Sequence, residues 1–369
     1  MRICYVAEAR FTHTEKWVTY FADKGHDIHL ISPEPFEGDN IANVKLYPLR
    51  RVRPRIRIMS VLTDILCHII QTRKLVREIK PDILHAHYIS DNGFLAALCG
   101  FHPLVLTGWG SDVLVEAHQS RIYRYFVKFA LKRADLITSD GENMIDEMIK
   151  LGADPDKINY LLHGVDTQEF NPQAKSLKEE RKMFDSPLVI SVRTLMPIYD
   201  LETLIQSVPL VLAQIPKVKF VIAGDGSQKY YLGDLARSLG VLESISFIGR
   251  IPHKELPYYL AAGDVYVSTS LSDTTSVSLL EAMASGLAPV VTDVGDVRKW
   301  IRSGENGFIV PIKRPDLLAE KIIYLLENRE LRGKMGKANR QLIEEKADYE
   351  QEMGKMGKLY EELIRRSRR

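Results

Sequence analysis

The sequence has no apolar run long enough to span a bilayer, which argues against an integral membrane protein. Its first residues, MRICYVAEARF, lack the apolar core and small-residue cleavage site of a secretory signal peptide. Cysteine is scarce. The three residues Cys4, Cys67 and Cys99 are scattered without metal-binding spacing and predict reduced, buried thiols. We therefore expect a cytoplasmic protein.

An excess of charge of one sign is also missing. The 50 basic and 48 acidic side chains give a formal net charge of +2, so we expect no nucleic acid as a partner. Basic residues do gather in LRRVRPRIR, residues 49–57, ahead of the apolar stretch IMSVLTDILCHII. This run is either a solvated loop or a peripheral contact with the anionic inner face of a membrane. Its arginines are Arg50, Arg51, Arg53, Arg55 and Arg57.

Low-complexity segments and short repeats are absent; apolar β-branched runs alternate instead with amphipathic helical patterns. Each half of the chain has about six such runs, which predicts two tandem, doubly wound, Rossmann-like α/β domains with parallel sheets. The polar, charged segment 165–187 separates them. We expect an N-terminal domain over 1–170, a C-terminal domain over 185–345, and a final helix over 346–369 that can pack back on the first domain.

Open parallel sheets bind ligands at the carboxyl ends of their strands, so we expect a cleft where the two domains face each other. The segment LSDTTSVSLLEAMASG, residues 271–286, leaves one such strand end and begins a helix. Free N–H groups at a helix start bind anions, and Glu281 on its partly buried face needs a polar partner. The segment is therefore either a site for phosphate and sugar hydroxyls or an ordinary capped helix.

Two other strand ends carry groups suited to a nucleotide. Arg193 follows the buried run LVISV, where a guanidinium can bind phosphate through two hydrogen bonds or pair with Asp200 or Glu202. Gly249, Arg250 and Ile251 follow the run ISFI, where a base ring can rest on the backbone.

The order of these motifs resembles the donor domain of the family 4 glycosyltransferases, which have the GT-B fold. The resemblance runs from about Pro187 to Pro311, through AGDG, FIGRIPHKELPYYLAAGDVYVSTS, LLEAMASG, APVVTDVGDVRKWI and GENGFIVP. The first half agrees more loosely, through FADKGHDIHLIS, KPDILHAHY, GSD, RADLITSD and HGVDTQEFNP.

The resemblance implies a role for each matching residue. Arg193 would contact the donor phosphates, the backbone of Gly249, Arg250 and Ile251 would hold the nucleobase, and Glu281 would bind the ribose hydroxyls. The loop that faces the phosphate and the transferred sugar would consist of Asp273, Thr274, Thr275, Ser276 and Val277. The resemblance also implies that the domain over 1–170 binds the acceptor and the domain over 185–345 binds the donor. It further implies a retaining reaction that needs neither a metal nor another cofactor.

The sequence departs from the family pattern in ways that suggest a variant subgroup. Asp273 stands where the family has the first of two glutamates, and Thr274 and Ser276 stand where it has glycines. Tyr199 replaces a lysine that binds phosphate. Arg193 and the helix terminus would then carry most of the leaving-group charge, unless another cation is supplied from elsewhere.

The N-terminal half offers fewer candidates. In TGWGSDVL, Trp109 replaces a family histidine and is either a stacking platform for a sugar ring or a core residue, and Asp112 is either catalytic or a helix cap. His13 lies in EARFTHTEKW, where the family has a glycine-rich loop, and we expect it in the cleft. His85 and His87 share one strand face, and a place in the core is the commoner role for such histidines.

Together these observations predict a retaining, metal-independent glycosyltransferase. We expect a nucleotide-diphosphate sugar as donor, UDP being favoured over GDP, and a polysaccharide or lipid-linked glycan as acceptor. Two alternatives stay open. One is a nucleotide-sugar epimerase or hydrolase, and the other is a sugar-nucleotide-binding protein with little or no catalysis, which Tyr199 and Trp109 would favour.

Overall fold

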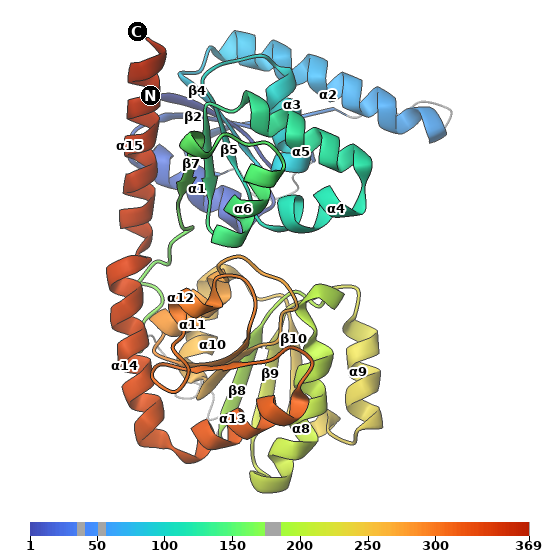
Figure 1. Ribbon diagram of the computed structural model, residues 1–369, viewed down its shortest axis with the longest axis vertical. Helices are drawn as coiled ribbons and strands as arrows, with labels where there is room; N and C mark the ends of the chain where they lie inside the picture. Colours follow the sequence, from blue (N-terminus) through green and yellow to red (C-terminus); the bar gives the residue numbers. More distant parts are fainter. Residues whose placement is uncertain (35–40, 51–56, 174–185, 369) are drawn as a thin grey trace. The chain divides into compact units, whose positions relative to one another are not determined.

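The computed structural model describes residues 1–34, 41–50, 57–173 and 186–368, without the side chains of residues 57–62. The chain forms two compact units (Figure 1). Unit 1 comprises Met1–His163 and Glu352–Arg369, and unit 2 comprises Gly164–Gln351. None of the described helices combines the length and the apolar character needed to cross a membrane.

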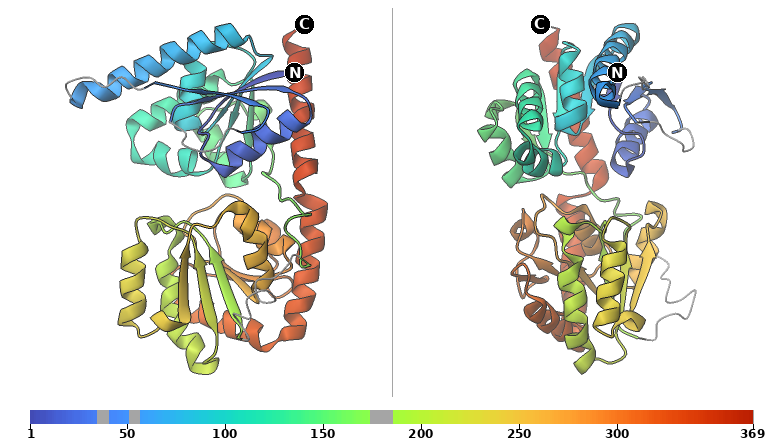
Figure 2. Two further views of the ribbon diagram at one scale, coloured as in Figure 1. Left: turned by 180° about the vertical axis from the view of Figure 1, so that it is seen from behind. Right: turned by 90° about the vertical axis from the view of Figure 1, so that its right-hand side faces the viewer.

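Unit 1 is built on a seven-stranded parallel sheet in the order β3-β2-β1-β4-β5-β6-β7. Its strands are β1 (Arg2–Val6), β2 (Asp27–Ser32), β3 (Val44–Pro48), β4 (Ile83–His87), β5 (Leu104–Thr107), β6 (Leu136–Ser139) and β7 (Ile158–Tyr160). Helices lie on both faces of this sheet (Figure 2). They include α1 (Thr12–Asp23), α2 (Arg57–Ile79), α3 (Phe94–Leu98), α4 (Ala117–Gln119), α5 (Arg121–Arg133), α6 (Glu142–Lys150) and α15 (Tyr349–Ser367).

The sheet of unit 1 has one strand more than the sequence pattern predicted. The missed strand is β3, whose residues VKLYP lie at the sheet edge and are only partly buried. An edge strand does not need the continuous apolar run that marks a strand covered on both faces. The buried-thiol prediction was also too broad, because Cys4 is buried whereas Cys67 and Cys99 are partly exposed.

Unit 2 has the six-stranded parallel sheet that the sequence predicts, in the order β10-β9-β8-β11-β12-β13. Its strands are β8 (Leu188–Val192), β9 (Lys219–Ala223), β10 (Ile245–Gly249), β11 (Val265–Ser268), β12 (Ala288–Thr292) and β13 (Phe308–Val310). Its helices include α8 (Leu201–Gln214), α9 (Lys229–Ser238), α10 (Leu256–Ala262), α11 (Val277–Ala284), α12 (Val297–Trp300), α13 (Pro315–Glu327) and α14 (Arg329–Lys346).

The strand orders locate a crevice in each unit. In unit 1 the chain adds strands outward from β1 toward one edge of the sheet and then, from β4 on, toward the other edge. In unit 2 the same reversal falls between β8 and β11. Connections leave such a switch point toward opposite sides, which opens a crevice at the carboxyl ends of the two strands. The first ligand-binding candidates are therefore the residues that follow Val6, His87, Val192 and Ser268.

Candidate functional site

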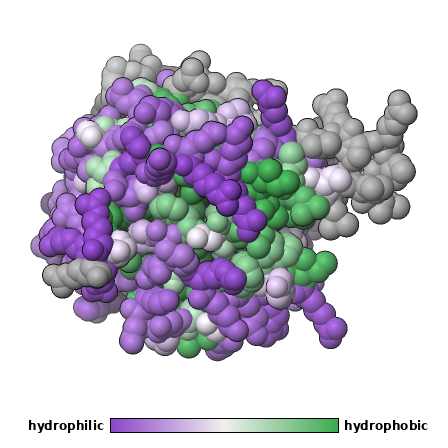
Figure 3. Space-filling view, turned by 90° about the horizontal axis from the view of Figure 1, so that it is seen from above, coloured by the Kyte–Doolittle hydropathy of each residue, from purple (hydrophilic) through white to green (hydrophobic). Residues whose placement is uncertain are grey.

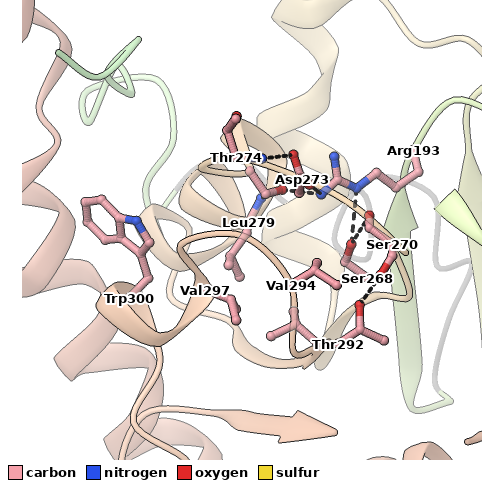
Figure 4. A pocket seen from close by; sticks show the side chains of 12 residues that line it. Arg193, Ser268, Ser270, Asp273, Thr274, Leu279, Thr292, Val294, Val297 and Trp300 are labelled. Atoms are coloured by element: carbon pink, nitrogen blue, oxygen red, sulfur yellow. Dashed lines mark hydrogen bonds and ion pairs between the residues drawn. The ribbon is translucent and has the colours of Figure 1, made fainter. Parts of the chain in front are cut away.

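The guanidinium of Arg193 lies at the switch point of unit 2, one residue after β8 (Figure 4). Its Nε donates to the Ser268 hydroxyl at 3.1 Å, and its Nη2 donates to Oδ2 of Asp273 at 2.5 Å and to the Ser276 hydroxyl. Burial opposes the charge of Arg193, but the carboxylate of Asp273 outweighs it and holds the guanidinium pKa above its ordinary value. Arg193 is therefore a fixed cation at this strand end.

The ion pairs that the sequence offered for Arg193 as an alternative do not form. Asp200 accepts from the Thr203 hydroxyl, and Glu202 accepts from the side chains of Gln206 and Tyr231. The tyrosine at the family's lysine position has a different role, since the guanidinium carbon of Arg193 lies 5.1 Å from the centroid of the Tyr199 ring. Tyr199 thus packs against the cation instead of adding a second one.

The loop from Asp273 to Ser276 leads directly into α11. Ser276 is the N-cap, and its hydroxyl accepts from the amide of Leu279 at 3.3 Å. Thr274 and Thr275 are buried, and the Thr275 hydroxyl has no hydrogen-bond partner among the described residues. Val277 begins the helix, so its N–H belongs to the first turn, where amides lack helical acceptors.

Two glycines allow this loop and the Arg193 loop to pack closely on neighbouring backbone. A Cβ on Gly295 would lie 2.4 Å from the carbonyl oxygen of Asp273, and a Cβ on Gly224 would lie 1.9 Å from that of Arg193. Both glycines also have positive φ, at 56° and 150°. The turn GDG, residues 224–226, therefore lets the backbone approach Arg193 closely. Gly295 does the same for the Asp273 loop, and the sequence pattern did not indicate this role.

The loop covers a small cavity (Figure 4). One side of it is polar, with the arginine and the hydroxyls of Ser268 and Ser270, and the other side is apolar. The apolar lining comes from Leu279, Val291, Val294, Val297 and Trp300.

Glu281 lies on the buried face of α11, only 4% exposed. Its Oε1 is 2.7 Å from Nε2 of His253, which stands in the short 3-10 turn His253–Glu255 after β10. The partner that a buried carboxylate needs is thus an imidazole, which the sequence analysis did not identify. The ring of His253 in turn packs edge-on against Phe170 at 5.2 Å.

The predicted nucleobase contact lies at the end of β10. Gly249 ends the strand with φ 73°, and its carbonyl oxygen accepts from the amide of Gly224 at 2.8 Å. The side chain of Arg250 is exposed and that of Ile251 is partly exposed. Glu281, Arg193 and this strand end therefore lie on elements that share the carboxyl edge of one sheet.

Asp112 of unit 1 is fully buried at the start of the π-helical turn Asp112–Glu116. Its carboxylate accepts from the amides of Ile89 at 2.6 Å and Trp109 at 3.1 Å. Burial raises the pKa of Asp112 to about 6, although these amides oppose the shift. Both oxygens are thus bound to backbone amides, and the N-cap residue of this turn is Ser111 and not Asp112.

The other N-terminal candidates lie among packed aromatic rings. Trp109 is partly exposed, and its ring lies edge-on to His13 at 5.6 Å and to Phe11 at 5.5 Å. His85 is a core histidine, with Nδ1 2.5 Å from the Tyr360 hydroxyl and Nε2 2.7 Å from the Thr107 hydroxyl. His87 is equally buried, but it does not share these partners.

The arginine run lies mostly outside the described residues. Only Arg50 is described in full. It is exposed, and its backbone amide donates to the Gln71 side chain at 3.0 Å. In the described part of the chain, no three His, Cys, Asp or Glu side chains are placed to hold a metal ion.

Comparisons with known proteins agree with this architecture. The model of "Glycosyl transferases group 1" matches residues 172–342, and that of "Glycosyl transferase 4-like" matches residues 2–141. The N-acetyl-alpha-D-glucosaminyl L-malate synthase of Bacillus anthracis is 22% identical over 93% of this chain and 91% of its own length. The sulfoquinovosyl transferase SQD2 of Arabidopsis thaliana is 24% identical over 89% of this chain and 66% of its own length.

Solved structures show the same fold at low sequence identity. HepE of Anabaena in complex with UDP-glucose has a TM-score of 0.83 and 17% identity, covering 98% of this chain and 100% of that one. The sucrose-phosphate synthase of Thermosynechococcus elongatus has a TM-score of 0.82 and 17% identity, covering 98% of both chains.

Two Rossmann-like domains with these matches define an enzyme of the GT-B fold that transfers glycosyl groups. More particularly, the chain belongs to family 4 of the glycosyltransferases, with a 4-like N-terminal half and a group 1 C-terminal half. The predictions of family, fold and enzyme class are confirmed.

Proposed function

We propose that the protein is a retaining, metal-independent transferase that moves a sugar from a nucleotide-diphosphate donor to a polysaccharide or lipid-linked glycan. Unit 2 binds the donor and unit 1 binds the acceptor. One observation carries the donor assignment. An arginine that is largely shielded from water, the start of α11 and a buried glutamate lie at the carboxyl edge of the sheet in unit 2.

Each of these groups suits one part of the donor. Arg193, with the first amides of α11, stabilises the negative charge that grows on the departing diphosphate. Glu281 accepts hydrogen bonds from the ribose hydroxyls, and the backbone of Gly249, Arg250 and Ile251 holds the base. The acceptor hydroxyl attacks from the face that the diphosphate leaves, and its proton passes to a phosphate oxygen. The step therefore needs no metal and no added cofactor.

UDP is the nucleotide we favour over GDP. HepE of Anabaena was solved with UDP-glucose, and this chain has the same fold. Titrating the full chain with UDP and then GDP by isothermal calorimetry tests the choice. Tighter binding of GDP would reverse it.

Acceptor dependence separates the proposed transferase from its alternatives. A transferase converts the nucleotide sugar only slowly without an acceptor and accelerates when a suitable glycan is added. An epimerase or hydrolase needs no acceptor, and a binding protein gives no turnover with any acceptor. Adding EDTA should leave the rate unchanged. A rate that falls with EDTA and returns with a divalent metal would exclude the metal-independent mechanism.

We also propose that the enzyme works in the cytoplasm and docks peripherally on an anionic membrane surface through residues 50–57. The described part of α2 exposes Leu66 and Ile70. Hydrophobic side chains gather on the face seen in Figure 3 among hydrophilic ones. A basic segment beside an apolar helix face suits an anionic surface, and lipid-linked acceptors would be concentrated there.

A further inference from the structure

A buried histidine at the switch point of unit 1 has no hydrogen-bond partner. His87 ends β4, beside β1, and is 1% exposed, yet neither ring nitrogen has a partner among the described residues. His85 stands two residues earlier in the same strand with the same burial, and both of its nitrogens are bonded, to Tyr360 and Thr107. Because buried polar groups are almost always paired, His87 calls for a functional explanation.

Further unpartnered polar atoms surround His87. The Trp17 ring is 4.8 Å from that of His87 and nearly perpendicular to it, and Trp109 lies 5.6 Å from His87. Both indole nitrogens are buried and without a partner in the described part of the chain. His163 follows β7 and stacks on His13 at 4.8 Å, and its Nδ1 is likewise buried and without a described partner. These atoms come from α1 and from the segments that end β4 and follow β5 and β7.

His87 and His163 are uncharged at neutral pH. Burial, together with the charges that neighbouring histidines would carry, holds the pKa values of His87 and His163 well below the ordinary range. Lys16 opposes protonation of His163, and Oδ2 of Asp140 lies 3.7 Å from its Nε2. That carboxylate favours the proton on Nε2, which leaves Nδ1 of His163 as an acceptor.

The unpartnered atoms therefore include both donors and acceptors. Each indole offers one N–H, a neutral His87 offers one N–H and one lone pair, and Nδ1 of His163 offers a lone pair. A carboxylate or a phosphodiester only accepts hydrogen bonds and would leave the lone pairs unmatched. A sugar hydroxyl both donates and accepts, and the flat indole face of Trp109, which is partly exposed, suits the C–H surface of a sugar ring.

We propose that His13, Trp17, His87, Trp109 and His163 form a subsite for an uncharged, hydroxyl-bearing sugar ring of the acceptor. The enzyme would thus recognise the acceptor here through a glycan residue and not through an anionic headgroup. This inference rests on the proposed function in one respect, namely that unit 1 binds the acceptor.

Saturation-transfer NMR on the full chain tests the subsite. The probes are the methyl glycosides of glucose, galactose, mannose and N-acetylglucosamine, with inorganic phosphate as the anionic probe. We expect at least one glycoside to receive saturation and phosphate not to displace it. His87→Phe should abolish the signal, and Trp17→Phe, which removes the indole N–H and leaves a smaller aromatic ring, should weaken binding about tenfold. Displacement by phosphate would assign the cluster to an anion and overturn the proposal.

The matched control is Tyr360→Phe, which also removes a buried polar group from unit 1 but leaves the cluster intact. It should bind the glycoside as the parent does. The melting temperature of His87→Phe should equal or exceed that of the parent, because an unpaired buried imidazole is removed. A destabilised His87→Phe that still binds the glycoside would make His87 structural. If that variant does not fold, Trp17→Phe with parental binding overturns the proposal.

Binding of UDP separates this inference from the proposed function. UDP should bind the parent and all three variants equally, because the proposed donor residues lie in unit 2. Binding of UDP without binding of any glycoside defeats the subsite alone. Failure of the parent to bind any nucleotide defeats the proposed function, whatever the glycosides do.

Discussion

The Nη2 atom of Arg193 lies 2.5 Å from Oδ2 of Asp273, and both side chains are largely shielded from water. Asp273, which stands where the family has a glutamate, is therefore the ion-pair partner of Arg193, the proposed phosphate-binding cation. Because an aspartate side chain is one methylene shorter than that of glutamate, the loop must come close to β8 to make this pair. A donor phosphate must then share the guanidinium with Asp273 or displace it.

We first predict that Arg193→Ala lowers turnover by about a hundredfold or more, because a preorganised charge that stabilises the leaving group is lost. Arg193→Lys should also be impaired, since lysine lacks the planar, two-pronged geometry. The loss should appear mainly in kcat and less in donor affinity. Steady-state kinetics with the identified donor measures both. A folded Arg193→Ala enzyme with near-parental turnover would move the leaving-group role to another cation.

Asp273→Asn should have the opposite effect on nucleotide affinity. The amide keeps an oxygen for the Thr274 amide, which Oδ1 of Asp273 accepts at 3.0 Å, but it no longer neutralises Arg193. Removing a partly exposed ion pair of this kind is worth about 1 kcal/mol, so UDP should bind about fivefold more tightly. Isothermal calorimetry gives the dissociation constants. Weaker binding would mean that Asp273 contacts the donor directly in a way that the amide cannot replace.

Glu281→Gln should weaken donor binding while the fold stays intact, because the charge-assisted hydrogen bonds to ribose are lost. Each such bond is worth about 1.5–3 kcal/mol. His253→Gln should produce a smaller loss of the same kind, since His253 holds the carboxylate at 2.7 Å. Calorimetry with the nucleotide measures both variants, and circular dichroism confirms folding. Unchanged affinity in Glu281→Gln would restrict Glu281 to a structural role.

The positions of the proposed donor-binding residues in unit 2 could be predicted from the sequence because these residues follow strands that are covered on both faces. Such strands read as continuous apolar runs, and their ends then mark the site edge, as for Arg193 after LVISV. The alternation of strands and helices alone therefore indicates that Arg193 and Ser276 lie at the same edge of the sheet. The edge strand β3 lacked this signal and was missed.

The partners of these residues could not be predicted in the same way. His253 reaches Glu281 across 28 positions of the chain, and Asp273 reaches Arg193 across 80. Spacing along a strand or helix does not encode such contacts. The same limit hid the histidine cluster. HAHY shows two histidines on one strand face, but it does not show that Tyr360 bonds to His85 and leaves His87 without a described partner.

Replacing Arg50, Arg51, Arg53, Arg55 and Arg57 by serine should reduce binding to anionic membranes. Basic residues near such a surface contribute about 1 kcal/mol each, so the parent should sediment with phosphatidylglycerol-containing vesicles and the variant should not. Vesicles of phosphatidylcholine alone are the control, and UDP affinity should not change. Equal sedimentation of the parent and the variant would favour the solvated-loop interpretation.

The last prediction concerns acid. An unfolded histidine has a pKa near 6.5, and burial lowers that of His85 to about 3 and those of His87 and His163 well below 6.5. As the pH falls below 6.5, the unfolded chain binds protons that the native state does not, so the free energy of unfolding should decrease. Asp112 acts in the opposite direction below pH 6, because its raised pKa makes the native state the stronger proton binder.

Denaturant titrations of the parent at pH 7.5, 6.5, 5.5 and 4.5 should therefore show stability that is retained above pH 6.5 and falls below it. Each buried neutral histidine contributes about 1.4 kcal/mol per pH unit to that fall. His87→Phe removes one such group, so its stability should decline less steeply by about that amount. Equal slopes for His87→Phe and the parent between pH 6.5 and 4.5 would mean that His87 binds its proton equally well in the native and unfolded states. The uncharged character of the cluster, and with it the argument for a neutral sugar ligand, would then be lost.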